Sequence, residues 1–189
     1  MRFAFPVAIC LTLSSHVLAG LDVTAYSGLR KVEHAKLNRD GLPVAKNQVK
    51  LSPIDFPERF ANLQAGAVYQ FDRQVDFEAG SYSGFNIWRN ELAKLGGYRA
   101  IKAKTAENKT EIRYDAAAWQ SKSGPFWELI NFSDAEGVIG PVACKKLYAD
   151  FVAFHSAAMA DPMPGFKESY QDWENALKMA SNNGALEFH

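Results

Sequence analysis

The stretch FDRQVDFEAGSYSGFNIWRNELAKLGGY, residues 71–98, decides the fold class, because its side-chain pattern changes from that of a strand to that of a helix. Residues 66–80 alternate polar and apolar side chains for most of their length, as a half-buried strand does. The residues after them repeat large apolar side chains at helical spacing. These are Phe85, Trp88, Leu92 and Leu95. We therefore expect a strand that is followed closely by an amphipathic helix.

Both ends of this helix are marked in the sequence. Ser83 is expected to cap its first turn, because a serine hydroxyl can accept a hydrogen bond from a free amide there. Gly96 and Gly97 are expected to end it, as glycine does at many helix C-termini. Lys94 lies in the last turn, where a positive charge interacts favourably with the helix dipole.

The rest of the chain predicts two more helices and several short strands. Helices are expected from Pro141 to about Ala158 and from about Phe166 to Ser181. Further strands are expected at residues 21–26, 98–104, 110–114 and, as an edge strand, 185–189. Residues 126–132 fit either a strand or a helical turn. The sum is an α+β fold in which residues 20–189 form a single domain, with about three main helices packed on a small, mainly antiparallel sheet.

Composition excludes several classes of function. The 189 residues carry no formal net charge and contain no basic block, so nucleic acid is an unlikely partner. Cys10 and Cys144 belong to no CxxC motif and no Cys/His cluster, which argues against a zinc site of the usual spacing. No motif indicates a cofactor, since GxGxxG, P-loop, HExxH and EF-hand patterns are absent.

Residues 1–19 have the pattern of a secretory signal peptide. Arg2 precedes an apolar run, and Val17 and Ala19 are the small residues expected before a cleavage point. The run is too short for an ordinary transmembrane helix. Cleavage after Ala19 would place the protein outside the cytoplasm, whereas a translation start near Val17 or Leu18 would leave it in the cytoplasm.

The segment ELINFSDAEGVIGP, residues 128–141, carries the main candidate acids. Asp134 and Glu136 are expected to cap the following helix or its preceding turn. Three functional alternatives remain open. The amides of residues 137–142 are suited to an anion at a helix start, the two acids with Glu128 are suited to a hard cation, and the acid pair is suited to general acid/base work.

The segment SYSGFNIWR, residues 81–89, carries the other candidate binding residues, which are Ser81, Tyr82, Asn86 and Arg89. Its hydroxyls are expected to cap the helix. Arg89 is suited to a bidentate grip on a carboxylate or phosphate, although such an arginine often pairs with a structural acid. His189 is a further catalytic candidate, or else a side chain at the end of an edge strand.

Four segments resemble a family of small bacterial and phage or prophage proteins of unknown function. The segments are GLDVTAYSGL, FDRQVDFEAGSYSGFNIWRNELAKLGGY, GPFWELINFSDAEGVIGP and NNGALEFH. They follow one another in the same order and span nearly the whole chain after residue 20. The resemblance implies a link to phage or prophage but supplies no catalytic residues.

Three functions are compatible with these patterns. We expect first a small soluble binding or interaction protein, with a polar pocket formed by residues 81–89 and 128–137 and with an unknown small ligand or protein as its partner. The first alternative is a hydrolase that uses Asp134 and Glu136, with or without a divalent cation. The second alternative is an exported, envelope-associated protein. The first is favoured because no nucleophile, base and orienting group can be assigned together.

Overall fold

The computed structural model describes residues 20–51, 57–104, 108–132 and 137–189. Its helices are α1 (Tyr82–Leu95), α2 (Asp115–Trp119), α3 (Trp127–Ile130), α4 (Pro141–Met159) and α5 (Phe166–Ala180), with a short 3-10 helix, η1 (Pro57–Phe60). Its strands are β1 (Gly20–Ser27), β2 (Arg30–Lys31), β3 (Gln48–Lys50), β4 (Val68–Gln70), β5 (Arg73–Ser81), β6 (Ile101–Lys104), β7 (Thr110–Arg113), β8 (Gly137–Ile139) and β9 (Ala185–Phe188). The predicted α+β class is confirmed, as are the three main helices α1, α4 and α5.

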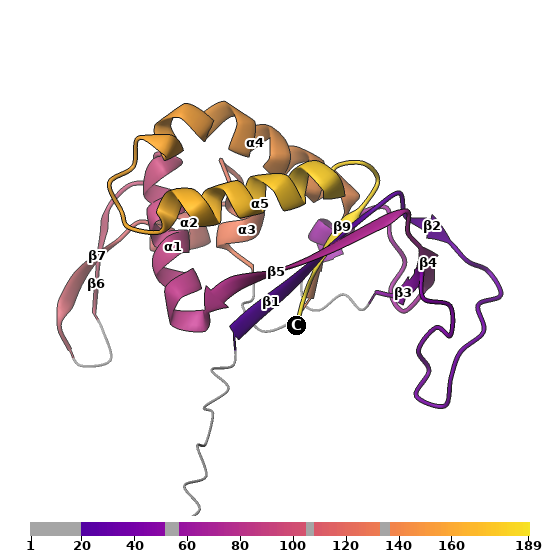
Figure 1. Cartoon of the computed structure of the whole chain (residues 1–189). Helices are drawn as coiled ribbons and strands as arrows, with labels where there is room; N and C mark the ends of the chain where they lie inside the picture. Colours follow the sequence, from indigo (N-terminus) through magenta and orange to yellow (C-terminus); the bar gives the residue numbers. More distant parts are fainter. Residues whose placement is uncertain (1–19, 52–56, 105–107, 133–136) are drawn as a thin grey trace, which may run out of the picture.

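The main sheet has four antiparallel strands in the order β5-β1-β9-β8 (Figure 1). The strand predicted at the C-terminal end exists as β9, but its predicted edge position is wrong. Leu186 and Phe188 are both buried, and β8, which the sequence did not predict, pairs with the side of β9 that faces away from β1. An apolar strand of this kind is stabilised by neighbours on both sides.

Helices α4 and α5 lie over one face of the main sheet (Figure 1). Leu21, Val23 and Ala25 of β1 point toward this face and are fully buried. The centre of the core is Trp173 of α5. Its ring centroid lies 5.0–5.8 Å from the centroids of four other rings, which belong to Phe77, Phe85, Trp88 and Phe188. The aromatic residues predicted for the apolar stripe of α1 therefore join the helices to the sheet.

The opposite face of the main sheet is covered at one end. The small sheet β2-β4-β3 and η1 contribute to a second apolar cluster, which includes Tyr26, Leu51, Phe60 and Val138. The hairpin β6–β7 projects from the side of α1 that faces away from the main sheet (Figure 1). The other end of this sheet face, around Asp22, carries polar side chains.

Three local predictions need correction. Ser81, not Ser83, caps α1, because its backbone is extended and its Oγ accepts a hydrogen bond from the Gly84 amide at 3.1 Å. The ambiguous residues 126–132 contain the helical turn α3. Residues 137–139, expected as free amides before a helix, form β8.

Candidate functional site

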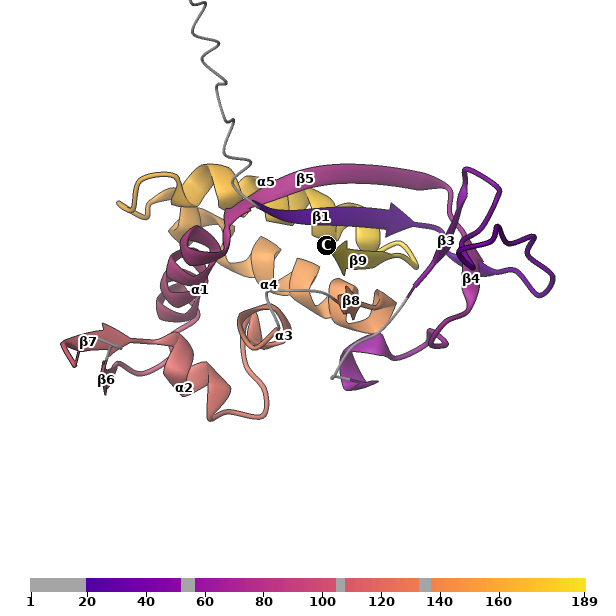
Figure 2. The same ribbon diagram turned by 90° about the horizontal axis from the view of Figure 1, so that it is seen from below.

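The antiparallel topology brings several candidate residues to one end of the main sheet. Gly20 at the start of β1 lies opposite Ser81 at the end of β5. Gly137 at the start of β8 lies opposite Phe188 at the end of β9. His189 follows β9, and its amide donates to the carbonyl oxygen of Asp22 at 3.0 Å. The start of α1 and His189 are therefore found at the same end of the sheet (Figures 1 and 2).

A hydrogen-bonded group from β1, β5 and the residue after β9 occupies the polar face at this end. Thr24 of β1 donates through Oγ1 to Oδ1 of Asp76 at 2.9 Å. The same Oγ1 lies 3.0 Å from Nε2 of His189. Because a threonine hydroxyl has one proton and a carboxylate accepts, His189 must supply the Nε2–H of the second hydrogen bond. The imidazole therefore acts as a donor toward Thr24.

A pocket of about 530 Å³ opens beside this group. Its described lining is Asp22, Val23, Thr24, Asp76, Phe77, Glu78 and His189. Three of these residues are acids, and none of these lining residues is a lysine or an arginine. The pocket thus presents carboxylates to whatever enters it, and such a site attracts positive charge and hydrogen-bond donors.

A second polar pair lies deeper on the same face. Tyr26 donates through Oη to Oε2 of Glu187 at 3.2 Å. Burial raises the pKa of the Glu187 carboxyl, while the charge of His189 and the hydrogen bond from Tyr26 act in the opposite direction. Burial, followed by the nearby Glu187 charge, also raises the pKa of Tyr26. The neutral Tyr26 hydroxyl therefore donates a hydrogen bond to the partly desolvated carboxyl group of Glu187.

We expect Glu187→Gln to be more stable than the wild type at pH 7. The raised pKa means that the folded state disfavours the charged carboxylate, so this cost is absent below the unfolded pKa of about 4.3, grows as the pH rises toward the folded pKa, and is complete above it. Glutamine keeps an acceptor for Tyr26 and carries no charge. Urea unfolding at pH 7 and at about pH 4 should show an advantage for the variant that is lost at the lower pH. The exposed Glu168→Gln is the control, and an equal advantage at both pH values would contradict the assignment.

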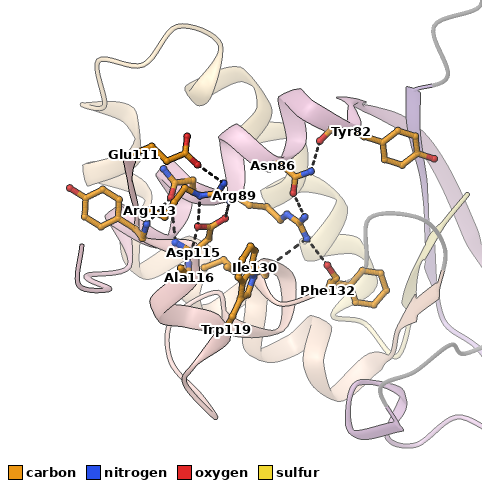
Figure 3. Close-up of polar contacts among 12 residues, drawn as sticks. Tyr82, Asn86, Arg89, Glu111, Arg113, Asp115, Ala116, Trp119, Ile130 and Phe132 are labelled. Carbon is orange, nitrogen blue, oxygen red and sulfur yellow. Dashed lines mark hydrogen bonds and ion pairs between the residues drawn. The ribbon is translucent and has the colours of Figure 1, made fainter. Parts of the chain in front are cut away.

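Three of the four candidate residues of α1 and its cap have structural contacts, and the fourth, Tyr82, is 38% exposed. Ser81 caps the helix. Asn86 donates through Nδ2 to the carbonyl of Tyr82 at 2.9 Å and accepts a hydrogen bond from Arg89 (Figure 3). Arg89 is 5% exposed, and its guanidinium lies 4.7 Å from the ring centroid of Phe85.

Arg89 joins the two polar segments that the sequence singled out. Its Nη1 donates to the carbonyl of Ile130 at 3.4 Å and to that of Phe132 (Figure 3). The ring of Phe132 in turn lies 4.4 Å from that of Phe188. The two segments therefore do come together, with Arg89 binding main-chain carbonyls at the C-terminal end of α3.

The remaining candidates are placed as follows. Asp134 and Glu136 lie outside the described residues, so their capping, cation-binding and acid/base roles stay predictions. Glu128 forms an ion pair with Lys146 at 2.6 Å and is not among the described residues that line the pocket. Part of the proposed anion site is taken up by main-chain hydrogen bonds, because β8 pairs with β9 and the amide of Gly140 donates to the carbonyl of Arg59 at 2.7 Å. For the Val142 amide the anion-binding role stays a prediction.

The described ranges contain no group of three or more His, Cys, Asp and Glu side chains that could hold a metal ion. Within the same ranges, no helix is both long and apolar enough to span a membrane. No family model, curated protein or solved structure matches this chain. The resemblance to phage and prophage proteins accordingly stays a prediction.

Proposed function

We propose that this is a small binding protein whose sheet-face pocket accepts a positively charged group of a ligand or partner. The observation that carries the proposal is the hydrogen-bonded group Thr24–Asp76–His189 at the wall of a pocket that also presents Asp22 and Glu78. Thr24 is 5% exposed, and its two hydrogen bonds fix the positions of Asp76 and His189. Polar groups that are held in place before binding lose little entropy when a ligand arrives.

The same geometry gives less support to a hydrolase. In a triad the histidine accepts the proton of the nucleophile, whereas here Thr24 accepts a hydrogen bond from His189 and donates its own proton to Asp76. In a catalytic triad a third group orients the base through its other nitrogen. No described residue makes a hydrogen bond to Nδ1 of His189. We therefore place binding ahead of catalysis.

Thermal unfolding with a cationic probe tests the proposal. Spermidine is expected to raise the melting temperature of the wild type, because a ligand that binds only the folded state stabilises it. The triple variant Asp22→Asn, Asp76→Asn, Glu78→Gln should lose most of this rise, since it keeps the pocket's shape and removes its charge. Succinate, a dianion, should leave the wild type unchanged.

The matched control is Asp40→Asn with Glu168→Gln, which neutralises two exposed acids outside the pocket. This variant should respond to spermidine as the wild type does. No rise in the wild type, or the same rise in the triple variant, would overturn the proposal.

A further inference from the structure

One edge of the main sheet is open. β5 is nine residues long, and within the described ranges it pairs with β1 alone. The other edge strand, β8, has three residues and is followed by Gly140, whose amide donates to the carbonyl of Arg59 in η1. A long strand with unpaired main-chain groups is a template for another strand.

A groove of about 740 Å³ runs beside this open edge, between β5 and α5. Val75 and Phe77 of β5 contribute apolar surface, and Ala176 and Met179 of α5 contribute more. Val75 is 46% exposed, which is unusual for a valine whose neighbour Ala25 is fully buried. Helix α5 follows β5 along the sheet (Figures 1 and 2). A groove between an edge strand and a helix is suited to an extended peptide, which gains main-chain hydrogen bonds from the strand and side-chain contacts from the groove.

The main-chain groups that face the open edge can be assigned from the pairing. The His189 amide donates to the Asp22 carbonyl, so alternate residues of β1 from Asp22 onward bond to β9, and those between them bond to β5. The residues of β5 opposite Val23 and Ala25 are Phe77 and Val75. The main-chain N–H and C=O groups that point toward the open edge therefore belong to the alternate residues of β5, which are Gln74, Asp76 and Glu78.

The side chains of the same outward-facing residues decide the partner. Asp76 and Glu78 lie on the polar face of the sheet, opposite Thr24 and Asp22 of β1. A residue placed directly across from a carboxylate in an antiparallel pair is favourable when it is basic and unfavourable when it is acidic. The other face of an added strand would lie beside Val75 and Phe77, which favours apolar residues there.

We infer that β5 binds an extended peptide segment of a partner protein as an additional antiparallel strand, with alternating basic and apolar residues. The basic residues face Asp76 and Glu78, and the apolar residues enter the groove beside α5. A second copy of this chain is a poor occupant, because antiparallel pairing of β5 with itself brings Asp76 and Glu78 close to the same acids of the copy. This inference goes beyond the proposed pocket and adds the open edge of β5 and the groove beside α5, while Asp76, Phe77 and Glu78 contribute to both sites.

A labelled peptide tests the inference. The probe is fluorescein-labelled acetyl-Lys-Val-Lys-Val-Gln-amide, and its binding to the wild type is followed by fluorescence anisotropy. N-methylation of the two lysine amides removes the donors that face β5 and should weaken binding at least tenfold. N-methylation of the two valine amides, which face solvent, should leave binding nearly unchanged. A peptide with glutamate in place of lysine should not bind.

Protein variants complete the test. Asp76→Asn and Glu78→Gln should each weaken binding by up to about fivefold, as expected for one cross-strand charge pair. Val75→Lys should abolish peptide binding. Val142→Lys on α4, where the valine is 49% exposed, should leave peptide binding unchanged.

Equal loss of binding for both methylation patterns, or no binding of the peptide by the wild type, would overturn the inference. If spermidine binds and the peptide does not, the pocket stands and the strand addition fails. A dimer in sedimentation velocity that Val75→Lys dissociates would instead show that the edge pairs with a second copy.

Discussion

Replacing Trp173 with alanine is expected to lower the free energy of unfolding by about 4 kcal/mol. The side chain is 1% exposed and stacks with Phe85 and Trp88 of α1. It also meets Phe77 edge-on at 5.0 Å. Its removal leaves a cavity at the point where α1, α5 and the main sheet meet, and a close-packed core can collapse into such a space only in part.

Guanidinium unfolding monitored by circular dichroism would measure this effect. Trp119→Ala is the matched control, because Trp119 is 49% exposed and its loss should cost much less. A cost for Trp173→Ala as small as that for Trp119→Ala would contradict the aromatic core described above.

Arg89→Ala is expected to cost about 3 kcal/mol of stability. Arg89 is buried and donates to the carbonyls of Ile130 and Phe132, so its removal leaves buried acceptors without these donors. Arg89→Lys should recover only part of the loss, because an ammonium group lacks the planar fork that reaches several acceptors at once.

The control for this prediction is Arg39→Ala, which removes an exposed arginine and should be nearly neutral. The sequence pattern leaves open that Arg89 binds a ligand, in which case Arg89→Ala would fold normally and lose binding. A fully stable Arg89→Ala protein would restore that hypothesis, whereas the burial of Arg89 favours a structural role.

Local patterns in the sequence were enough to predict the main elements of the fold. The helical spacing of Phe85, Trp88 and Leu92 predicted α1, and all three residues are buried. Pro141 and Gly97 marked helix ends correctly, since α4 begins at Pro141 and the cap of α1 is followed by Gly97 at a positive φ of 79°. These signals depend only on residues that are close in the sequence, so they can be recognised before the fold is known.

The position of β9 depends on distant residues and was not predictable in the same way. The sequence of Ala185–Phe188 is that of a short apolar strand. It does not show that β8 pairs with this strand on the side that faces away from β1. β8 itself has three residues, too few to show a period. Strand order of this kind is set by packing across the whole chain.

The candidate site was predictable in part. The alternation of β1 places Asp22, Thr24 and Tyr26 on one face, and the sequence alone makes His189 a catalytic candidate. The contact of Thr24 with Asp76 and His189 required the register that joins β5, β1 and β9, and no local spacing encodes that register. Asp134 and Glu136 lie outside the described residues, so their roles are still predictions from sequence.

The most direct test of the binding proposal is a titration of the isotope-labelled protein with spermidine, followed by nuclear magnetic resonance. If the sheet-face pocket binds the cation, saturable shifts will appear at the His189 imidazole and at the amides of Thr24 and Asp76. Shifts confined to Asp134 and Glu136, with none at His189, would contradict the proposal and would move the binding site to the segment between Phe132 and Gly137.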